Sequence, residues 1–267
     1  MDINSDVTLQ SGNKMPVLGL GTWQLTNDTA GTIVKALELG YRMIDTSGDY
    51  GTQPGVGEGI KRSGVGRSDF YLVTKVEETD DAYEATRKNL DELQLEYADL
   101  MLIHRPPKAG PGHELWEGLI RAKKEGLVRD IGVSNYSIQQ MQELADASGE
   151  MPVVNQIEWS PFGRSDEMLD FCKQNGIIIQ AYSPLTRTKR LEDEALVAVA
   201  ERHRKTPAQV LIRWSMQLGT VPIPKANQIP HLEEDIDVFD FELSDEDMTT
   251  LNGLNEEYSA LSGHPYV

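Results

Sequence analysis

Cysteine is almost absent from this sequence, which has a single thiol, Cys172, among 267 residues. One thiol excludes an intrachain disulfide, and its place in the apolar-periodic run at 168–172 favours packing inside a helix over a reactive role. Long apolar runs are also missing, because no segment reaches the roughly 18 residues that a membrane span needs. The first residues lack the basic and apolar segments of a secretory signal. We therefore expect a cytoplasmic protein without a membrane partner.

Positive charge is scarce as well. The sequence has 25 Lys and Arg against 43 Asp and Glu, a formal net charge of −18. A surface of that sign repels phosphate backbones, so we expect no nucleic-acid partner. Metal-binding patterns such as CxxC or HExxH do not occur, and we expect no metal. Hydrophobic residues make up 39% and charged residues 25%, which is typical of a globular chain with a sizeable core.

What the sequence does contain is a regular alternation of short β-rich runs and amphipathic helical stretches. Eight strands are predicted, at Val17–Gly19, Arg42–Asp45, Phe70–Thr74, Asp99–Ile103, Asp130–Val133, Val153–Gln156, Ile177–Ala181 and Val221–Pro224. Helices are predicted between them, near 29–40, 80–96, 113–125, 137–147, 166–175 and 192–217, the last divided at Thr206-Pro207. Residues 7–16 predict a hairpin.

Two parallel-sheet architectures fit this alternation, an α/β barrel and a doubly wound sheet. The doubly wound sheet usually carries a glycine-rich phosphate turn after its first strand, and the candidate turn at 19–24 lacks the third glycine. The count of eight favours a single (β/α)8 TIM barrel over residues 1–267. The hairpin would plug the N-terminal end of this barrel, and a helix and a short tail would follow at the C-terminus. We expect the protein to be a monomer.

Polar residues recur at the predicted strand ends. Asp45, Lys75, His104 and Ser134 are spaced by 30, 29 and 30 residues, about one βα unit each. The carboxyl ends of barrel strands form the active-site mouth, so these side chains are expected to meet there with Tyr50. Singly, each has a plain structural explanation, such as a turn cap or a solvated strand end. Together they form an acid–base device, in which a cation held by a carboxylate lowers the pKa of a tyrosine from about 10.

The sequence resembles the aldo-keto reductase superfamily from about Val7 to about Pro265. The segments that carry the resemblance are LGLGTW (18–23), YRMIDTSGDYG (41–51), LVTKV (72–76), LIHRPP (102–107), IGVSNY (131–136), VNQIEWSPF (154–162), AYSPL (181–185), VPIPKA (221–226) and VFDFELSDEDM (238–248). Each is weak alone, but their order and their agreement with the strand ends make the joint signal specific.

The resemblance implies the reduction of small aldehydes or ketones by hydride transfer, with four catalytic residues. Tyr50 corresponds to the general acid that protonates the carbonyl oxygen, and Lys75 to the residue that depresses its pKa. Asp45 corresponds to the partner of Lys75, and His104 to the residue that orients the carbonyl. Two alternatives remain open at this stage, a non-catalytic regulatory barrel that binds nicotinamide and a barrel isomerase or aldolase.

The resemblance also implies a nicotinamide cofactor. The matching positions are Thr22, Ser134, Asn135, Gln156, Tyr182, Ser183, Leu185, Lys225, Ala226, His231, Glu234 and Asp235. In the family, Lys225 corresponds to the lysine that meets the adenosine 2′-phosphate, which favours NADPH. The Ser or Thr and the Arg that usually accompany this lysine are replaced by Ala226 and His231, so NAD is the alternative. Asp235 stands where the family has Asn.

The predicted substrate pocket departs from the family pattern towards polarity. Glu77 and Arg105 occupy positions where Trp is common, Trp23 is kept, and Asp49 precedes the proposed acid. We expect Arg105 to pair with one of the two carboxylates, to meet a polar substrate or to point outward. A loop contact that closes over the cofactor in some members is expected to be missing, because Gln24 and Lys189 occupy its positions.

Overall fold

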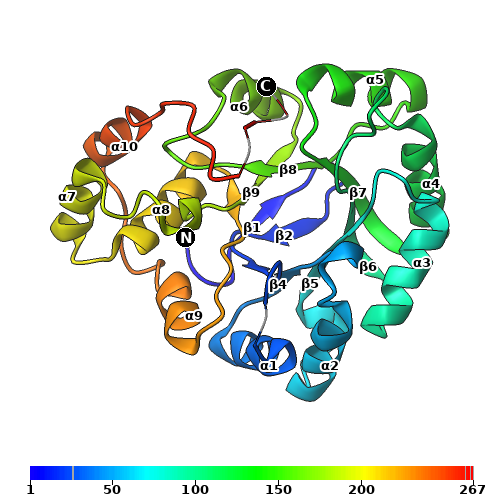
Figure 1. Cartoon of the computed structure of the whole chain (residues 1–267), viewed down its shortest axis with the longest axis horizontal. Helices are drawn as coiled ribbons and strands as arrows, with labels where there is room; N and C mark the ends of the chain where they lie inside the picture. The colour runs from blue at the N-terminus through cyan, green and yellow to red at the C-terminus, as the bar shows by residue number, and fades with distance from the viewer. Residues whose placement is uncertain (26, 262, 265, 267) are drawn as a thin grey trace.

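A computed structural model of the chain describes residues 1–25, 27–261, 263, 264 and 266, and it contains an eight-stranded parallel sheet curled into a barrel (Figure 1). The strands are β3 (Leu20–Gly21), β4 (Met43–Asp45), β5 (Tyr71–Val76), β6 (Ala98–Ile103), β7 (Val128–Ser134), β8 (Val154–Glu158), β9 (Ile178–Tyr182) and β10 (Val221–Pro222). They neighbour one another in sequence order. The predicted (β/α)8 fold is therefore confirmed.

Glycine brings the first and last strands together. Gly19 N donates a hydrogen bond to Pro222 O at 3.1 Å, and Gly21 N donates to Pro224 O at 2.9 Å. A Cβ on Gly21 would lie 2.9 Å from Ile223 O, so only glycine allows this approach. The Gly19-Leu20-Gly21 run thus serves barrel closure. It also places the first strand at 20–21, later than the predicted 17–19.

The helices surround the barrel (Figure 1). They are α1 (Thr29–Leu39), α2 (Gln53–Ser63), α3 (Ala82–Leu93), α4 (His113–Lys124), α5 (Ile138–Ser148), α6 (Asp166–Gln174), α7 (Glu194–His203), α8 (Pro207–Leu218), α9 (Ile229–Ile236) and α10 (Asp245–Asn252). Helix α8 begins at the predicted Thr206 cap, whose side chain accepts from Gln209 N. None of these helices, within the ranges described, is long and apolar enough to cross a membrane.

Helix α2 was missed by the sequence prediction because three glycines and a proline give it a poor helical signal. Tertiary packing explains the glycines. A Cβ on Gly57 would lie 2.3 Å from Leu93 O of α3, and one on Gly59 would lie 2.6 Å from the Ile33 side chain of α1. The small residues let α2 pack closely against its neighbours, and that packing outweighs the low propensity.

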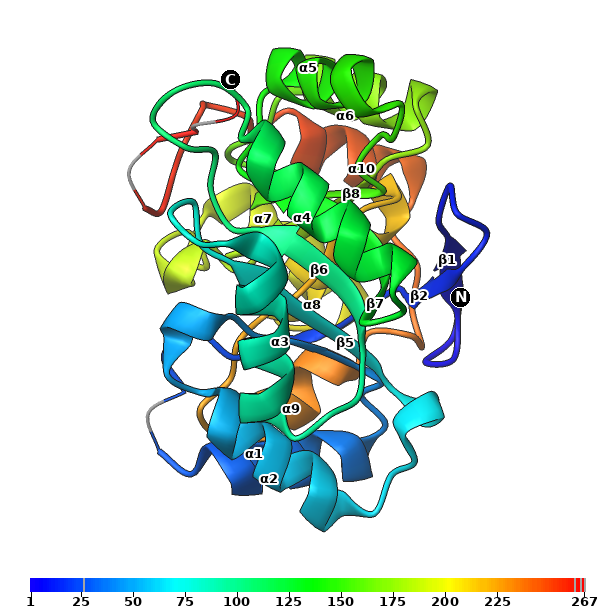
Figure 2. The same cartoon turned by 90° about the vertical axis from the view of Figure 1, so that its right-hand side faces the viewer.

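The hairpin of β1 (Asp6–Thr8) and β2 (Lys14–Pro16) lies at one end of the barrel, as predicted (Figures 1 and 2). Met15 of this hairpin is fully buried in the same apolar cluster as Met43 of β4 and Val73 of β5. Asn13 anchors the turn by donating a hydrogen bond to Asp130 at 2.9 Å. The described part of the C-terminal segment lies at the opposite end of the barrel (Figure 2).

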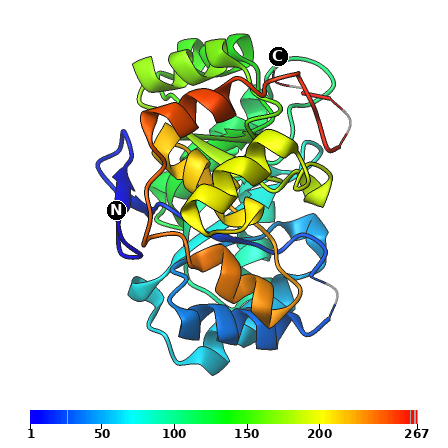
Figure 3. The ribbon, with the colours of Figure 1, turned by 90° about the vertical axis from the view of Figure 1, so that its left-hand side faces the viewer.

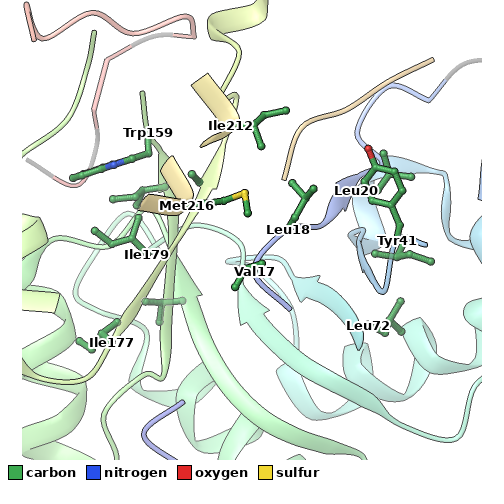
Figure 4. Close-up of a cluster of buried hydrophobic side chains, with 14 of the residues drawn as sticks. Val17, Leu18, Leu20, Tyr41, Leu72, Trp159, Ile177, Ile179, Ile212 and Met216 are labelled. Carbon is green, nitrogen blue, oxygen red and sulfur yellow. The ribbon is translucent and has the colours of Figure 1, made fainter. Parts of the chain in front are cut away.

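A larger apolar core fills the space between the sheet and the helices. Figure 4 shows part of it, including Met216 and Ile212 of α8 and Ile179 of β9. Helices α7 to α10 cover the side of the barrel formed by the last strands (Figure 3). Cys172 on α6 is fully buried, and burial raises the pKa of its thiol to about 12, in agreement with the predicted packing role.

Candidate active site

The carboxyl ends of the barrel strands line a cavity of about 430 Å³. Its lining residues are Gly21, Trp23, Gln24, Asp45, Tyr50, His104, Arg105, Ser134, Asn135, Gln156, Tyr182, Ser183, Pro184, Leu185, Arg187, Thr188, Ile223, Pro224, Lys225 and Leu261. Residues that the sequence nominated from seven separate segments therefore meet in one place. The strand-end argument identified Asp45, Tyr50, His104 and Ser134, and the family resemblance supplied the others.

A buried ion pair lies at the floor of this group. Lys75 Nζ lies 2.8 and 2.9 Å from the two Asp45 oxygens and donates to Thr46 O at 2.7 Å. Both side chains are almost fully buried, so the pair is held in a medium of low dielectric. Burial lowers the pKa of Lys75, and the charge and hydrogen bond of Asp45 oppose this shift. Gln156 adds a hydrogen bond to Asp45 at 2.7 Å.

Tyr50 reaches the cavity from a short 3-10 turn, η1 (Gly48–Tyr50), which ends at Gly51 in the left-handed region. Lys75 Nζ lies 4.8 Å from the centre of its ring, and the ring of His104 lies edge-on at 5.6 Å. Burial, reinforced by the charges of Asp45 and Asp49, raises the pKa of Tyr50 well above its usual value. The expected depression of this pKa by Lys75 is therefore not found, and Tyr50 keeps its proton at neutral pH.

His104 belongs to an ionic cluster with Glu77, Arg105 and Asp49. Its Nδ1 lies 2.8 Å from Glu77 Oε1 and 3.5 Å from Asp49 Oδ1. The guanidinium of Arg105 lies 3.1 Å from Glu77 and 3.5 Å from Asp49, so it pairs with both of the carboxylates that the sequence nominated. Arg105 also lines the cavity, although its side chain is 48% exposed.

The two carboxylates and the His104 nitrogen lie within 4.8 Å of one another, a spacing that could also admit a cation. Arg105 already supplies positive charge to both carboxylates. The cluster is therefore ion-paired as it stands. The pairing of Arg105 with these carboxylates was one of the expectations from the sequence, whereas the contacts of His104 with them were not.

The predicted nicotinamide contacts form a hydrogen-bonded set. Tyr182 OH donates to Asn135 Oδ1 at 2.8 Å, and Asn135 Nδ2 donates to His104 O at 3.2 Å. Ser134 Oγ donates to Gln156 O at 2.7 Å. Asn135 is in the left-handed region with φ 64°, which Asn tolerates better than most residues. This turn directs Ser134 and Asn135 into the cavity from the end of β7.

The predicted adenine-end residues divide into two groups. Lys225 is exposed and lines the cavity. The others lie outside the lining: Ala226 and Asp235 are buried, and His231 is exposed on α9. Glu234 is half-buried and also lies outside the lining.

Thr22 likewise lies outside the lining, and its buried hydroxyl bonds that of Thr52 at 3.2 Å.

The lining also includes Arg187 and Leu261. Arg187 lies beside the cavity with its guanidinium 5.2 Å from the Trp23 ring and 3.4 Å from Gln24 Oε1. Leu261 reaches the lining because the C-terminal tail is tethered, with Ser259 and the backbone N–H of Ala260 donating to the Glu158 carboxylate. Glu158 lies in the VNQIEWSPF segment, but nothing in that segment indicates a bond to the tail.

Comparisons with known proteins agree with this geometry. The family model described as "Aldo/keto reductase family" matches residues 17–256. A glyoxal reductase of Bacillus subtilis is 41% identical over 261 residues, which cover 96% of this chain and 94% of that enzyme. An aldo-keto reductase of Mycobacterium tuberculosis is 40% identical over 94% of this chain and 91% of that protein.

Solved structures give the same answer. An aldo/keto reductase from Brucella melitensis has a TM-score of 0.89 and 40% identity, covering 94% of this chain and 99% of that one. A Bombyx mori aldo-keto reductase in complex with NADP has a TM-score of 0.92 and 32% identity, covering 97% and 95%. These relatives are named as reductases, so the comparisons favour an oxidoreductase over a regulatory barrel, an isomerase or an aldolase. The chain belongs to the aldo/keto reductase family and is an oxidoreductase.

Proposed function

We propose that this enzyme reduces small polar aldehydes and ketones to alcohols with NADPH, with Tyr50 as the general acid. The observation that supports the proposal is that acid–base residues and residues suited to a phosphorylated cofactor line one cavity. Tyr50 and His104 line it with the Asp45–Lys75 pair beside them, and the cations Lys225 and Arg187 line it as well. A carbonyl and a phosphorylated cofactor therefore find complementary groups within a single space.

Proton transfer follows from the environment of Tyr50. Reduced nicotinamide supplies the hydride when it is bound. Tyr50 holds its proton at neutral pH and donates it only when negative charge develops on the carbonyl oxygen, which is then a far stronger base. The phenolate left behind lies beside the Lys75 ammonium, whose charge stabilises it. Asp45 and Thr46 keep that ammonium in place.

The cofactor preference rests on unneutralised positive charge. Within the residues the structure describes, neither Lys225 nor Arg187 has a carboxylate within 4.0 Å, although the chain carries a net charge of −18. Partial burial lowers the pKa of Lys225, and the nearby charge of Arg187 adds to this shift. A phosphate would relieve their repulsion. The 2′-phosphate of NADPH supplies one, and Arg187 would compensate for the arginine missing at His231.

Substrate polarity follows from the ionic cluster beside His104. Glu77 and Arg105 stand where apolar rings would favour aromatic substrates, and Asp49 pairs with Arg105 beside them. A charged wall of this kind is costly to cover with an apolar group. The 41% identical relative named a glyoxal reductase fits this preference, since glyoxal is small and polar. We infer that short dicarbonyl and hydroxylated carbonyl compounds are preferred.

The proposal is tested with purified protein and a panel of glyoxal, methylglyoxal, sugars, keto acids and aromatic aldehydes, each with NADPH and NADH. Consumption of the reduced cofactor is followed by absorbance. We expect NADPH-dependent turnover to be fastest with the small polar carbonyls. Faster turnover of aromatic aldehydes would contradict the substrate class, and equal use of NADH would contradict the cofactor assignment.

A further inference from the structure

A glutamine in the barrel interior, Gln180, holds the side chain of Gln156. The two residues stand opposite each other on the neighbouring strands β9 and β8, so their side chains project to the same side of the sheet. Gln180 is fully buried, and Gln156 is 2% exposed. Gln156 Nε2 lies 2.6 Å from Gln180 Oε1 and 2.7 Å from Asp45 Oδ1. One amide nitrogen therefore joins Gln180 to the buried Asp45–Lys75 ion pair.

The Asp45 carboxylate determines which end of the Gln156 amide faces it. An ionised carboxylate only accepts hydrogen bonds, and both oxygens of Asp45 are already held by Lys75, at 2.8 and 2.9 Å. The Gln156 atom beside Asp45 must therefore be the nitrogen. That nitrogen carries two hydrogens, one for Asp45 and one for Gln180. Both hydrogens are thus bound by oxygens of the protein.

Gln180 is itself fixed in one orientation. Its Oε1 accepts from Gln156, and its Nε2 lies 3.4 Å from the sulfur of Met43, which is a weak acceptor. A reversed Gln180 amide would set two N–H donors against each other. The direction of hydrogen bonding that Asp45 imposes therefore runs through Gln156 to Gln180 and ends at Met43 in the apolar interior of the barrel.

The side-chain oxygen of Gln156 is left for a ligand. Gln156 lines the cavity, and in the described part of the chain no group donates a hydrogen bond to its Oε1. Its backbone is also held, because Ser134 Oγ donates to Gln156 O at 2.7 Å. A fixed amide oxygen without a donor fits a ligand that presents an N–H group. The carboxamide of nicotinamide presents two such hydrogens.

We propose that Gln180 is a positioning residue for the cofactor, which acts by holding the second amide hydrogen of Gln156. Gln156 then presents only its oxygen to the cavity and selects the amino group of the nicotinamide carboxamide. Without an oxygen at position 180, one hydrogen of Gln156 loses its partner, and the amide turns that donor towards the cavity. This inference rests on the proposed NADPH-dependent reduction and names the part of the cofactor that Gln156 recognises.

The binding test compares NADP⁺ with its 3-acetylpyridine analogue, in which a methyl group replaces the amino group of the carboxamide. Both affinities are measured by calorimetry, so the test does not depend on turnover. We expect the wild type to bind NADP⁺ about fivefold more tightly than the analogue, the effect of one hydrogen bond. Gln180→Met keeps the length of the side chain but lacks the oxygen, and it should reduce this preference to less than about twofold.

Two further variants separate this role from a general loss of packing. Gln180→Glu keeps an oxygen for Gln156 and should retain the wild-type preference. Ser215→Ala removes a buried hydroxyl that lies 2.6 Å from that of Thr220 and should retain the preference as well. The inference would be overturned by equal affinity of the wild type for both compounds, by an unchanged preference in Gln180→Met, or by its equal loss in Gln180→Glu.

A second measurement observes the pair in the full chain without added cofactor. The two side-chain amide hydrogens of Gln156 are followed by ¹H–¹⁵N NMR, and Gln156→Met identifies their signals. We expect both hydrogens at the low-field shifts of hydrogen-bonded amides in the wild type, and one of them to move upfield in Gln180→Met. Identical shifts in the two proteins would contradict the contact. If NADP⁺ does not bind, the proposed cofactor fails, whereas the NMR result still tests the Gln180–Gln156 pair.

Discussion

In the proposed reaction the hydroxyl of Tyr50 donates a proton to the carbonyl oxygen, and the Lys75 ammonium lies 4.8 Å from the centre of its ring. Replacing Tyr50 with Phe removes that proton and leaves the ring. We expect carbonyl reduction to fall by about 10²–10⁴-fold, the usual contribution of a general acid. NADPH affinity, measured by fluorescence titration, should remain nearly the same because the cationic residues are untouched. A variant that keeps more than half of the wild-type turnover would show that another group donates the proton.

In the proposed substrate pocket, the charge of Arg105 favours polar carbonyl compounds over aromatic ones. Arg105→Trp replaces a guanidinium that pairs with Glu77 and Asp49 by an apolar ring. We expect kcat/KM for an aromatic aldehyde to rise relative to a polar carbonyl compound of similar reactivity, so that the order of preference reverses. The measurement is the ratio of the two kcat/KM values in both proteins. The same ratio in both would place Arg105 outside the substrate pocket.

His231 occupies the position where the family has an arginine, at the start of α9 and exposed. His231→Arg adds a permanently charged fork that matches a phosphate. We expect NADPH to bind several-fold more tightly while NADH affinity stays constant, as measured by calorimetry. Gln228→Arg, at the exposed residue before the same helix, is the control for a general gain of positive charge. Equal tightening of both cofactors would exclude contact with the 2′-phosphate.

Packing between elements, and not local propensity, holds α2 in place. Gly57→Ala would bring a Cβ to 2.3 Å from the Leu93 carbonyl oxygen of α3, which is backbone and cannot rotate away. We expect the free energy of unfolding to fall by about 1–3 kcal/mol, although alanine has the higher helix propensity. Chemical denaturation measures this change. Glu58→Ala, exposed on the same helix, should change stability by less than about 0.5 kcal/mol. A stabilising Gly57→Ala would mean that α2 and α3 can separate freely.

The stability of the whole molecule should depend on pH through Asp235. Burial, with a smaller contribution from Glu234, raises the pKa of this carboxyl to about 7. The folded state therefore holds a proton that the unfolded chain releases near pH 4, so stability falls as pH rises from about 4 to about 7. Asp235→Asn, the residue of the family pattern, should stabilise the protein at about pH 8 by up to about 4 kcal/mol, at about 1.4 kcal/mol per pH unit.

Thermal unfolding from about pH 4 to pH 8 checks this expectation. The melting temperature of Asp235→Asn should exceed that of the wild type at the alkaline end, and the difference should vanish at the acidic end. Glu233→Gln removes an exposed charge from the same helix and should show no such trend. A constant difference between Asp235→Asn and wild type at every pH would show that the carboxyl does not titrate in this range.

The sequence by itself determined the architecture and most of the site. Eight buried strands at regular spacing identify a barrel, and polar residues one βα unit apart must then meet at its carboxyl edge, since all parallel strands end on the same side. The spacing alone thus predicts that Asp45, Lys75 and His104 lie together, with Tyr50 in the loop that follows Asp45. The strands and the residues at their ends can be predicted because periodicity and spacing are properties of the sequence itself.

Only the tertiary structure decided the features that depend on contacts between distant segments. Helix α2 exists because its glycines fit against α1 and α3. The raised pKa of Tyr50 reflects the balance of burial and charge at one point in space, which no spacing rule predicts. The pairing of Glu77 with His104 joins residues 27 positions apart, and the Glu158 carboxylate holds a tail about 100 positions further along the chain. Distances between side chains set these interactions, and folding alone fixes those distances.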